Sequence, residues 1–224
     1  MLLSTRFHLP VAPIEYGADR INRSTLLAFA AHHGRTRKDG RTPQILHPLA
    51  VQGLLARVGF EDDALLSAAI LHDALEDNPG DAAQVLRLQI GHSLGSQVLA
   101  WVDALTDDAP AHLSRAERKA RQLERLQSAP PEVQLIKLAD VVASVQEGPA
   151  PGWTPAEARQ YLQQRTHLVQ SLLRRHCAEL GFYFQHALTQ PAWRLAHVAP
   201  DEASASPTRP HAGNSGNGGN ANGV

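Results

Sequence analysis

The sequence is almost without cysteine and without net charge. Cys177 is the one cysteine among 224 residues, so no disulfide can form within the chain, which fits a reducing cytoplasm. Lysine and arginine together number 21, aspartate and glutamate 22, and the formal net charge is −1. A chain-wide basic surface of the kind that binds nucleic acid is therefore not expected.

Long apolar runs are also missing. No stretch reaches the roughly 18 apolar residues that a spanning helix needs, so the sequence predicts no membrane span. The opening residues, MLLSTRFHLPVAPIEYG, match a signal peptide poorly because Arg6, His8 and two prolines interrupt the apolar positions. We therefore expect a cytoplasmic protein with neither a membrane nor a nucleic acid as partner.

Strand-like alternation of apolar and polar residues is absent, whereas helical spacing occurs in many segments. The pattern predicts one all-α domain over residues 21–198, after a loosely structured lead-in at 1–20. Residues 199–224 are rich in Gly, Asn, Ser, Pro and Ala, which predicts a disordered tail. The expected helices cover residues 24–33, 47–59, 61–77, 81–91, 93–106, 113–129, 130–148 and 154–180.

Four ionisable residues stand in the segment AAILHDALED, residues 68–77, which otherwise reads as a core helix. Burying a charge costs on the order of several kcal/mol unless a partner offsets it, and a bound cation is such a partner. Residues three and four apart share a helix face. On this spacing His72, Asp73, Glu76 and Asp77 are expected to face one pocket.

Two further residues complete a ligand set. His47 opens the preceding predicted helix, and Asp140 lies in the apolar helix LIKLADVV. Taken singly, each has an ordinary explanation: a histidine at a helix start, or an aspartate paired with a lysine or arginine in the core. Together with His72 and Asp73 they form a mixed nitrogen and oxygen set that suits Mn, Fe, Mg or Zn and leaves positions open for water and substrate.

The order of the motifs resembles that of a known family. The pattern of His47, His72-Asp73 and Asp140 is similar to the HD phosphohydrolase superfamily, and more closely to the hydrolase domain of the RelA/SpoT family and its stand-alone small alarmone hydrolases. The resemblance spans residues 24–176 and implies an all-α HD-domain helical bundle. The motifs that carry it are FAAHHGRTRKDG (29–40), HPLAV (47–51), AAILHDALED (68–77), VDALTDD (102–108) and IKLAD (136–140).

The resemblance also implies an activity and a set of roles. Hydrolases of this family remove the 3′-pyrophosphate from guanosine tetra- or pentaphosphate, usually with Mn²⁺, although another divalent metal would fit the ligands. Such a metal activates water and polarises a phosphoryl oxygen, while a carboxylate takes the proton. The resemblance implies metal ligands at His47, His72, Asp73 and Asp140, orientation and deprotonation of water by Glu76 and Asp77, and nucleotide contacts from Arg37, Lys38 and Lys137.

A basic loop precedes His47. Residues 35–41 hold four basic residues and one aspartate, a local balance of +3. Such a run is often a solvated loop. Its position directly before the His47 helix favours contact with a phosphate or a base.

The sequence departs from the family pattern around the expected nucleotide pocket. Val141 and Ser144 stand where the family has a basic residue and an asparagine, Gln44 replaces a tyrosine, and Asn78 replaces a threonine. Ser144 is four residues after Asp140, so it is expected on the same helix face, pointing toward the metal pocket as a substrate contact. The alternatives are therefore a metal-dependent phosphohydrolase of another nucleotide, or a regulator that binds a nucleotide without turnover. The water-activating pair argues against the regulator.

Overall fold

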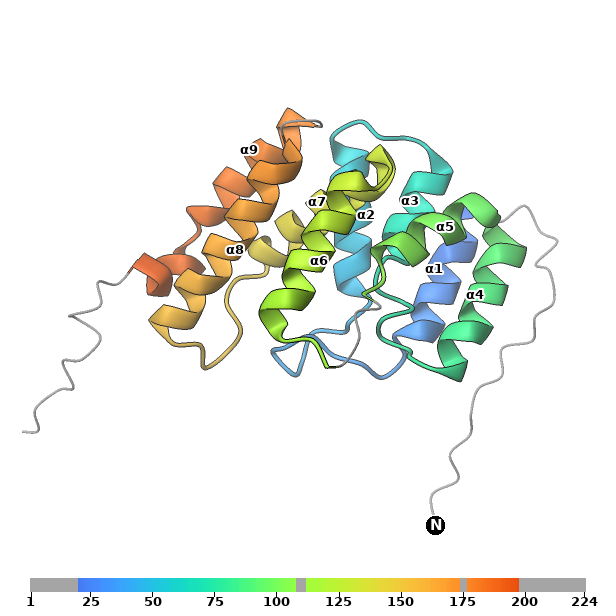
Figure 1. The fold of residues 1–224 in the computed structure, drawn as a ribbon, viewed down its shortest axis with the longest axis horizontal. Coiled ribbons are helices and arrows are strands. Elements are labelled where there is room, and N and C mark those ends of the chain that lie inside the picture. The colour runs from blue at the N-terminus through green and yellow to red at the C-terminus, as the bar shows by residue number, and fades with distance from the viewer. Residues whose placement is uncertain (1–19, 108–111, 174–176, 198–224) are drawn as a thin grey trace, which may run out of the picture.

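The computed structural model describes residues 20–107, 112–173 and 177–197. Within these residues every regular element is a helix, which confirms the all-α prediction (Figure 1). The predicted lead-in up to residue 19 and the predicted tail at 199–224 lie outside the described residues. The helices are α1 (Arg20–Ala31), α2 (Leu46–Arg57), α3 (Asp63–Ile70), α4 (Asp81–Leu94), α5 (Ser96–Leu105), α6 (Arg115–Ser128), α7 (Pro131–Gln146), α8 (Pro155–Leu173), α9 (Ala178–Leu188) and the 3-10 helix η1 (Pro191–His197).

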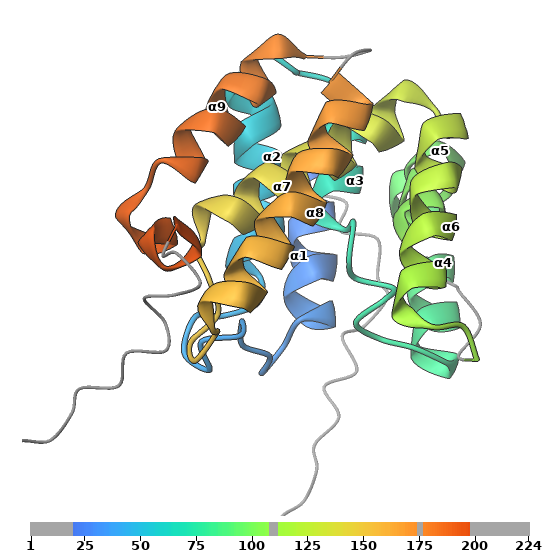
Figure 2. The ribbon, with the colours of Figure 1, turned by 60° about the vertical axis from the view of Figure 1, so that its left-hand side comes forward.

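Helix α7 lies at the centre of the bundle. Nearly all of its residues from Val133 to Val145 are buried, as expected for the apolar segment that contains Asp140. It packs against α2, α5, α8 and α9, while α3 packs against α1, α2 and α5. The bundle thus has α1, α3, α4 and α5 on one side and α8, α9 and η1 on the other, with α2 and α7 between them (Figures 1 and 2).

Several predicted helix boundaries are wrong. The expected helix at 154–180 is two helices, because the backbone leaves the helical region at Cys177, the residue before α9. The break lets α9 bury Leu180 and Phe184 in the core, and α9 packs against α7. The break between α4 and α5 lies at Gly95, which has a φ of 98°, a value that glycine adopts readily.

The expected helix at 61–77 is also wrong at its C-terminal end. Helix α3 ends at Ile70, and residues 71–77 form a run of turns. Side chains take up carbonyls that a longer helix would use: His72 Nδ1 donates to the Ala69 oxygen at 2.9 Å, and Asn78 Nδ2 donates to the Ala74 oxygen at 2.8 Å. The argument that four charged residues share one helix face therefore does not apply here.

No helix in the described part of the chain is both long enough and apolar enough to cross a membrane.

Candidate metal centre

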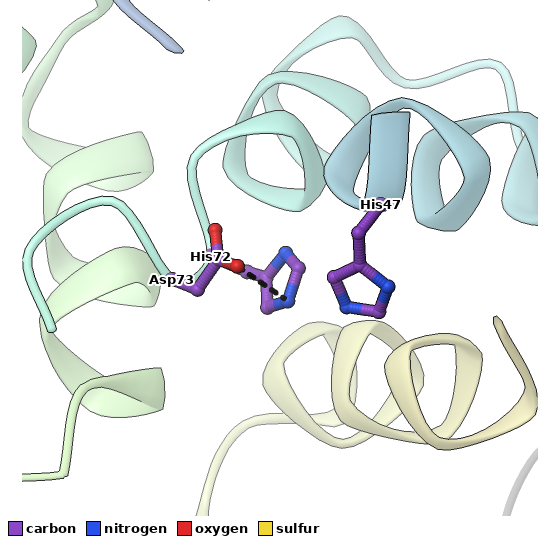
Figure 3. A group of neighbouring side chains, drawn as sticks. All are labelled: His47, His72 and Asp73. Carbon is purple, nitrogen blue, oxygen red and sulfur yellow. Dashed lines mark ion pairs between the residues drawn. The ribbon is translucent and has the colours of Figure 1, made fainter. Parts of the chain in front are cut away.

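The four predicted ligands meet although they come from three separate segments. His47 lies in the first turn of α2, His72 and Asp73 follow α3, and Asp140 is in the middle of α7. His47 Nε2 is 3.0 Å from Asp140 Oδ1, and His72 Nε2 is 3.7 Å from the same oxygen. His72 Nε2 is 4.0 Å from Asp73 Oδ2. Figure 3 shows the His47 and His72 rings side by side between α2 and α7, with Asp73 next to His72.

These separations fit a single metal ion. Donors about 2.1 Å from one ion lie roughly 3.0 Å apart at a right angle and about 4.2 Å apart when they face each other across it. The three distances given above fall within this range. His47, His72 and Asp73 each offer a ligand atom, and all three atoms lie within 4.8 Å of one another.

The second nitrogen of each histidine is held in the way that metal-binding histidines require. His72 Nδ1 donates to the Ala69 carbonyl, which leaves the lone pair on Nε2. His47 Nδ1 lies 2.8 Å from Glu147 Oε1, so its Nε2 faces Asp140 and His72. A carboxylate or carbonyl on the far nitrogen fixes the ring and raises its basicity as a ligand. The donor set therefore fits a divalent ion.

Buried charges balance one another across the centre. His47, His72 and Asp140 are 4%, 6% and 8% exposed. Burial would raise the pKa of Asp140, but Lys137, with Nζ 2.7 Å from Asp140 Oδ2, and the two histidines hold it well below its usual value. Burial would lower the pKa of His47, but hydrogen bonds to Asp140 and Glu147 raise it to about 9. Asp140 thus stays ionised and available as a ligand.

A third histidine, which sequence reasoning missed, adjoins the centre. His32, one residue past α1, lies with Nε2 3.2 Å from Asp73 Oδ1 and Nδ1 3.1 Å from Asp77 Oδ2, and its side chain is fully buried. Burial would lower its pKa, but the two carboxylates raise the pKa to about 9. The sequence signal was spacing: Ser24, Ala28 and His32 stand at intervals of four and so share one helix face. In the structure all three are buried.

Glu147, which directly follows α7, is the other residue that was missed. Besides its contact with His47, its Oε2 accepts a hydrogen bond from Arg37 Nε at 3.1 Å. Burial would raise the pKa of Glu147, but His47 and Arg37 lower it. Glu147 stands seven residues after Asp140, two turns along the same helix face, and that interval could have pointed to it.

The predicted water-activating pair lies at the edge of the centre. Asp77 is partly exposed and bound to His32. Glu76 is an exposed residue, yet its carboxylate loses part of its hydration against the protein, and this raises its pKa. Lys137 opposes the increase, while Asp107 and Asp140 add to it. A carboxylate with a raised pKa is a better proton acceptor for water.

The predicted nucleotide contacts fall into two groups. Lys137 and Ser144 adjoin the centre, since both donate hydrogen bonds to Asp140, at 2.7 and 3.3 Å. Arg37 is bound to Glu147 and donates to Gln44 Oε1 at 3.2 Å. Lys38 instead lies over an aromatic ring, with Nζ 5.4 Å from the Trp153 ring centre.

Known proteins are similar to this chain in sequence. Guanosine-3′,5′-bis(diphosphate) 3′-pyrophosphohydrolase MESH1 of Mus musculus is 33% identical over 151 residues, which cover 64% of this chain and 80% of that protein. The bifunctional (p)ppGpp synthase/hydrolase SpoT of Escherichia coli (strain K12) is 33% identical over 125 residues, 54% of this chain and 17% of that protein.

A solved structure is also similar, and a family model matches the chain. That structure, described as "A metazoan ortholog of SpoT hydrolyzes ppGpp and plays a role in starvation responses", has a TM-score of 0.66 at 28% identity and covers 77% of this chain and 96% of its own. The family model for the HD domain matches residues 25–175, which include all four predicted ligands. This chain belongs to the HD-domain family.

Proposed function

We propose that this protein is a metal-dependent 3′-pyrophosphohydrolase of guanosine tetra- and pentaphosphate that releases GDP or GTP and pyrophosphate. The observation that carries the proposal is the convergence of His47, His72, Asp73 and Asp140 from three segments, with three measured separations in the range that one ion requires. The relatives named for this hydrolysis supply the substrate class. We further propose that the protein acts in the cytoplasm.

Mn²⁺ is the proposed ion, held by the two histidines and two carboxylates. When bound, it would lower the pKa of a water molecule and polarise a phosphoryl oxygen. The mixed nitrogen and oxygen donors suit Mn²⁺ and leave room in its coordination shell, and they also accept other divalent ions.

The protein's own groups handle the proton and the water. Water adds to the phosphorus that is bonded to the 3′ oxygen, and the bond from that phosphorus to the 3′ oxygen breaks. The 3′ oxygen takes up a proton to become the 3′ hydroxyl of GDP or GTP, and pyrophosphate is released. Glu76 accepts the proton of the attacking water, which its raised pKa favours. Asp77, held at His32, orients that water.

Positive groups are needed because the substrate is strongly anionic. Lys137 stands 2.7 Å from Asp140 and can reach a phosphate beside the centre. Ser144 offers a hydroxyl on the same side of α7. Arg37 and Lys38 bring positive charge from the loop before α2, and Arg37 exchanges Glu147 for a phosphate when the nucleotide binds.

A second candidate is a phosphohydrolase of another nucleotide. Val141 is buried, so a basic contact is replaced by core packing, and Ser144 is shorter than asparagine. These features would relax the preference for a guanosine polyphosphate while leaving the metal ligands intact.

The test is a nucleotide panel. Purified protein is loaded with Mn²⁺ and given guanosine tetraphosphate, nucleoside monophosphates and 2′- or 3′-phosphorylated dinucleotides, and the product is identified as pyrophosphate or orthophosphate. We expect pyrophosphate from guanosine tetraphosphate and none from the His72→Ala variant. Faster release of orthophosphate from another nucleotide would favour the second candidate. Nucleotide binding without any product would favour the regulator.

A further inference from the structure

The segment from Leu71 to Asn78 carries two proposed metal ligands and both proposed catalytic carboxylates, yet it has no continuous helical hydrogen-bond ladder. Its backbone bonds are isolated turns, such as Ala74 N to Leu71 O at 3.0 Å and Asp77 N to Asp73 O at 3.0 Å. An irregular segment of this kind is fixed by contacts from outside it. The question is which contacts orient Asp73 and Asp77.

The chain at the C-terminal end of α1 supplies these contacts. Asn78 Nδ2 donates to the Ala31 carbonyl at 3.0 Å, and Arg35 donates to the Asp77 carbonyl. Both bonds are accepted by main-chain carbonyls, so they fix the path of the chain but not the side-chain carboxylates. His32, between the two, reaches the carboxylates themselves, at 3.2 Å for Asp73 and 3.1 Å for Asp77.

We propose that His32 is a positioning residue that clamps the metal ligand Asp73 and the carboxylate of Asp77 in their working orientations. The role of Asp77 rests on the proposed function, whereas the role of Asp73 needs only the metal. The His32 side chain is fully buried, so no water competes for its ring, while Asp73 and Asp77 are only partly covered. Without the ring both carboxylates would have freedom to rotate toward solvent.

Asp73 shows why a clamp is needed. Its Oδ2 accepts a hydrogen bond from Gln44 Nε2 at 3.1 Å and lies 4.0 Å from His72 Nε2. Its Oδ1 is buried and has no aligned hydrogen bond, with His32 at ion-pair distance. Gln44 and His32 therefore approach different oxygens and fix the plane of the carboxylate. Partners of this kind around ligating groups change metal affinity or activity by roughly 10- to 100-fold.

A second metal ion is the competing explanation, because His32, Asp73 and Asp77 also bring ligand atoms within 4.8 Å of one another. Asp73 faces Nε2 and Asp77 faces Nδ1, so the two carboxylates lie at different ring nitrogens. One ion would therefore take one ring nitrogen and one of these carboxylates, and the other carboxylate would support the far nitrogen, as Glu147 supports His47. The two explanations differ in the number of ions bound, and the experiment measures that number.

The experiment compares His32→Leu and His32→Gln with His33→Leu and His33→Gln. Leucine fills the buried space but donates nothing, whereas glutamine keeps one donor group. His33 is the adjacent exposed histidine and serves as the matched control. Full-length protein is measured for Mn²⁺ affinity and stoichiometry by titration, for melting temperature without metal, and for kcat and KM with guanosine tetraphosphate.

We expect His32→Leu to weaken Mn²⁺ binding and to lower kcat, each by roughly 10- to 100-fold, with little change in KM. His32→Gln should lie between His32→Leu and the wild type, and both His33 variants should match the wild type. Normal Mn²⁺ affinity and kcat in His32→Leu would overturn the clamp. So would a wild-type stoichiometry of two ions that falls to one in His32→Leu.

Two further outcomes separate the clamp from simpler roles. An equal drop in melting temperature in both His32 variants, with metal affinity and kcat falling in proportion, would assign His32 to packing and overturn the clamp. If the wild type has no hydrolase activity, the proposed function fails. The Mn²⁺ titration then still tests whether His32 supports Asp73 as a metal ligand, because that measurement needs no substrate.

Discussion

The proposed metal ligands and the expected nucleotide contacts lie beside one another but are held in different ways. His47, His72 and Asp140 are buried; His47 and Asp140 lie on the packed helices α2 and α7, and His72 follows α3 directly. Arg37 and Lys38 belong to the loop before α2, and each has a partner of its own in Glu147 and Trp153. We expect the first region to be rigid, because moving its buried side chains would disturb the core. The second can exchange partners without disturbing the fold.

This difference predicts different responses to substitution. Changes among the buried ligands remove the ion and with it every reaction that depends on the ion. Changes in the loop and on the exposed side of the pocket alter which anion is accepted and how tightly. The four predictions below test this division, from the largest expected effect to the smallest.

The largest effect should come from the ligands. The wild type should bind about one divalent ion per chain, and His72→Ala or Asp140→Ala should bind almost none, because each removes a donor from a four-donor set. Hydrolysis should disappear with the ion. Elemental analysis of the purified variants measures the occupancy. The control is Asp103→Asn, which removes a carboxylate of α5 that is bound to Arg87 of α4. Full metal occupancy in His72→Ala would refute the ligand assignment.

The next effect concerns proton transfer. Glu76→Gln should retain the fold and the metal but lose roughly 100-fold or more in kcat, the usual scale for a positioned acid or base. Glu124→Gln, an exposed glutamate on α6, is the matched control. Turnover near the wild-type rate in Glu76→Gln would move proton acceptance to Asp77 or to another group.

The early end of α3, before Glu76, is a feature that the sequence could not reveal. No glycine or proline separates Asp63 from Asn78, so local pattern continues the helix through the site. The helix ends at Ile70 because the following segment bonds to α1, as the Asn78 contact with Ala31 shows. Such a contact joins residues 47 positions apart, and local pattern carries no information about it.

Other parts were within reach of the sequence. A single aspartate in the apolar segment LIKLADVV predicted a buried carboxylate that needs a partner for its charge. Asp140 is indeed buried beside both histidines. The start of the helix that carries His47 was also within reach, because Pro48 suits the first turn of a helix, and α2 begins at Leu46. The partner of Arg37 was not predictable, because it depends on the path of the loop from Arg35 to Gln44.

Glu147 touches both regions and can test their coupling. Glu147→Gln should weaken Mn²⁺ binding about tenfold, because a neutral amide supports the basicity of His47 less well than a carboxylate. The same change releases Arg37 from its ion pair, so KM for guanosine tetraphosphate should fall at saturating Mn²⁺. Metal titration and steady-state kinetics measure the two effects separately. If metal affinity is unchanged, Glu147 does not support the ligand, and if KM rises, Arg37 needs Glu147 for its orientation.

The smallest effect should come from Ser144. It stands one turn after Asp140 and donates to Asp140 Oδ1 at 3.3 Å, so its side chain lies beside the metal centre as its spacing predicts. The resemblance places an asparagine here, which offers an amide donor and a carbonyl acceptor on a longer arm. A hydrogen bond to a charged group contributes about 1.5–3 kcal/mol, or roughly ten- to a hundredfold in binding, and a bridging water recovers part of that for serine.

Ser144→Asn should therefore raise kcat/KM for guanosine tetraphosphate by about tenfold, with metal occupancy unchanged. Ser144→Ala is the companion variant: it removes the hydroxyl without adding reach, so it should lower kcat/KM slightly or leave it unchanged. The gain should appear in KM, since the new amide contacts the bound nucleotide and not the attacking water. If Ser144→Asn abolishes hydrolysis while the protein keeps its metal and its melting temperature, the pocket is shaped for a different nucleotide. The division between a fixed metal region and an adaptable nucleotide region would then stand, but the second candidate function would replace the first.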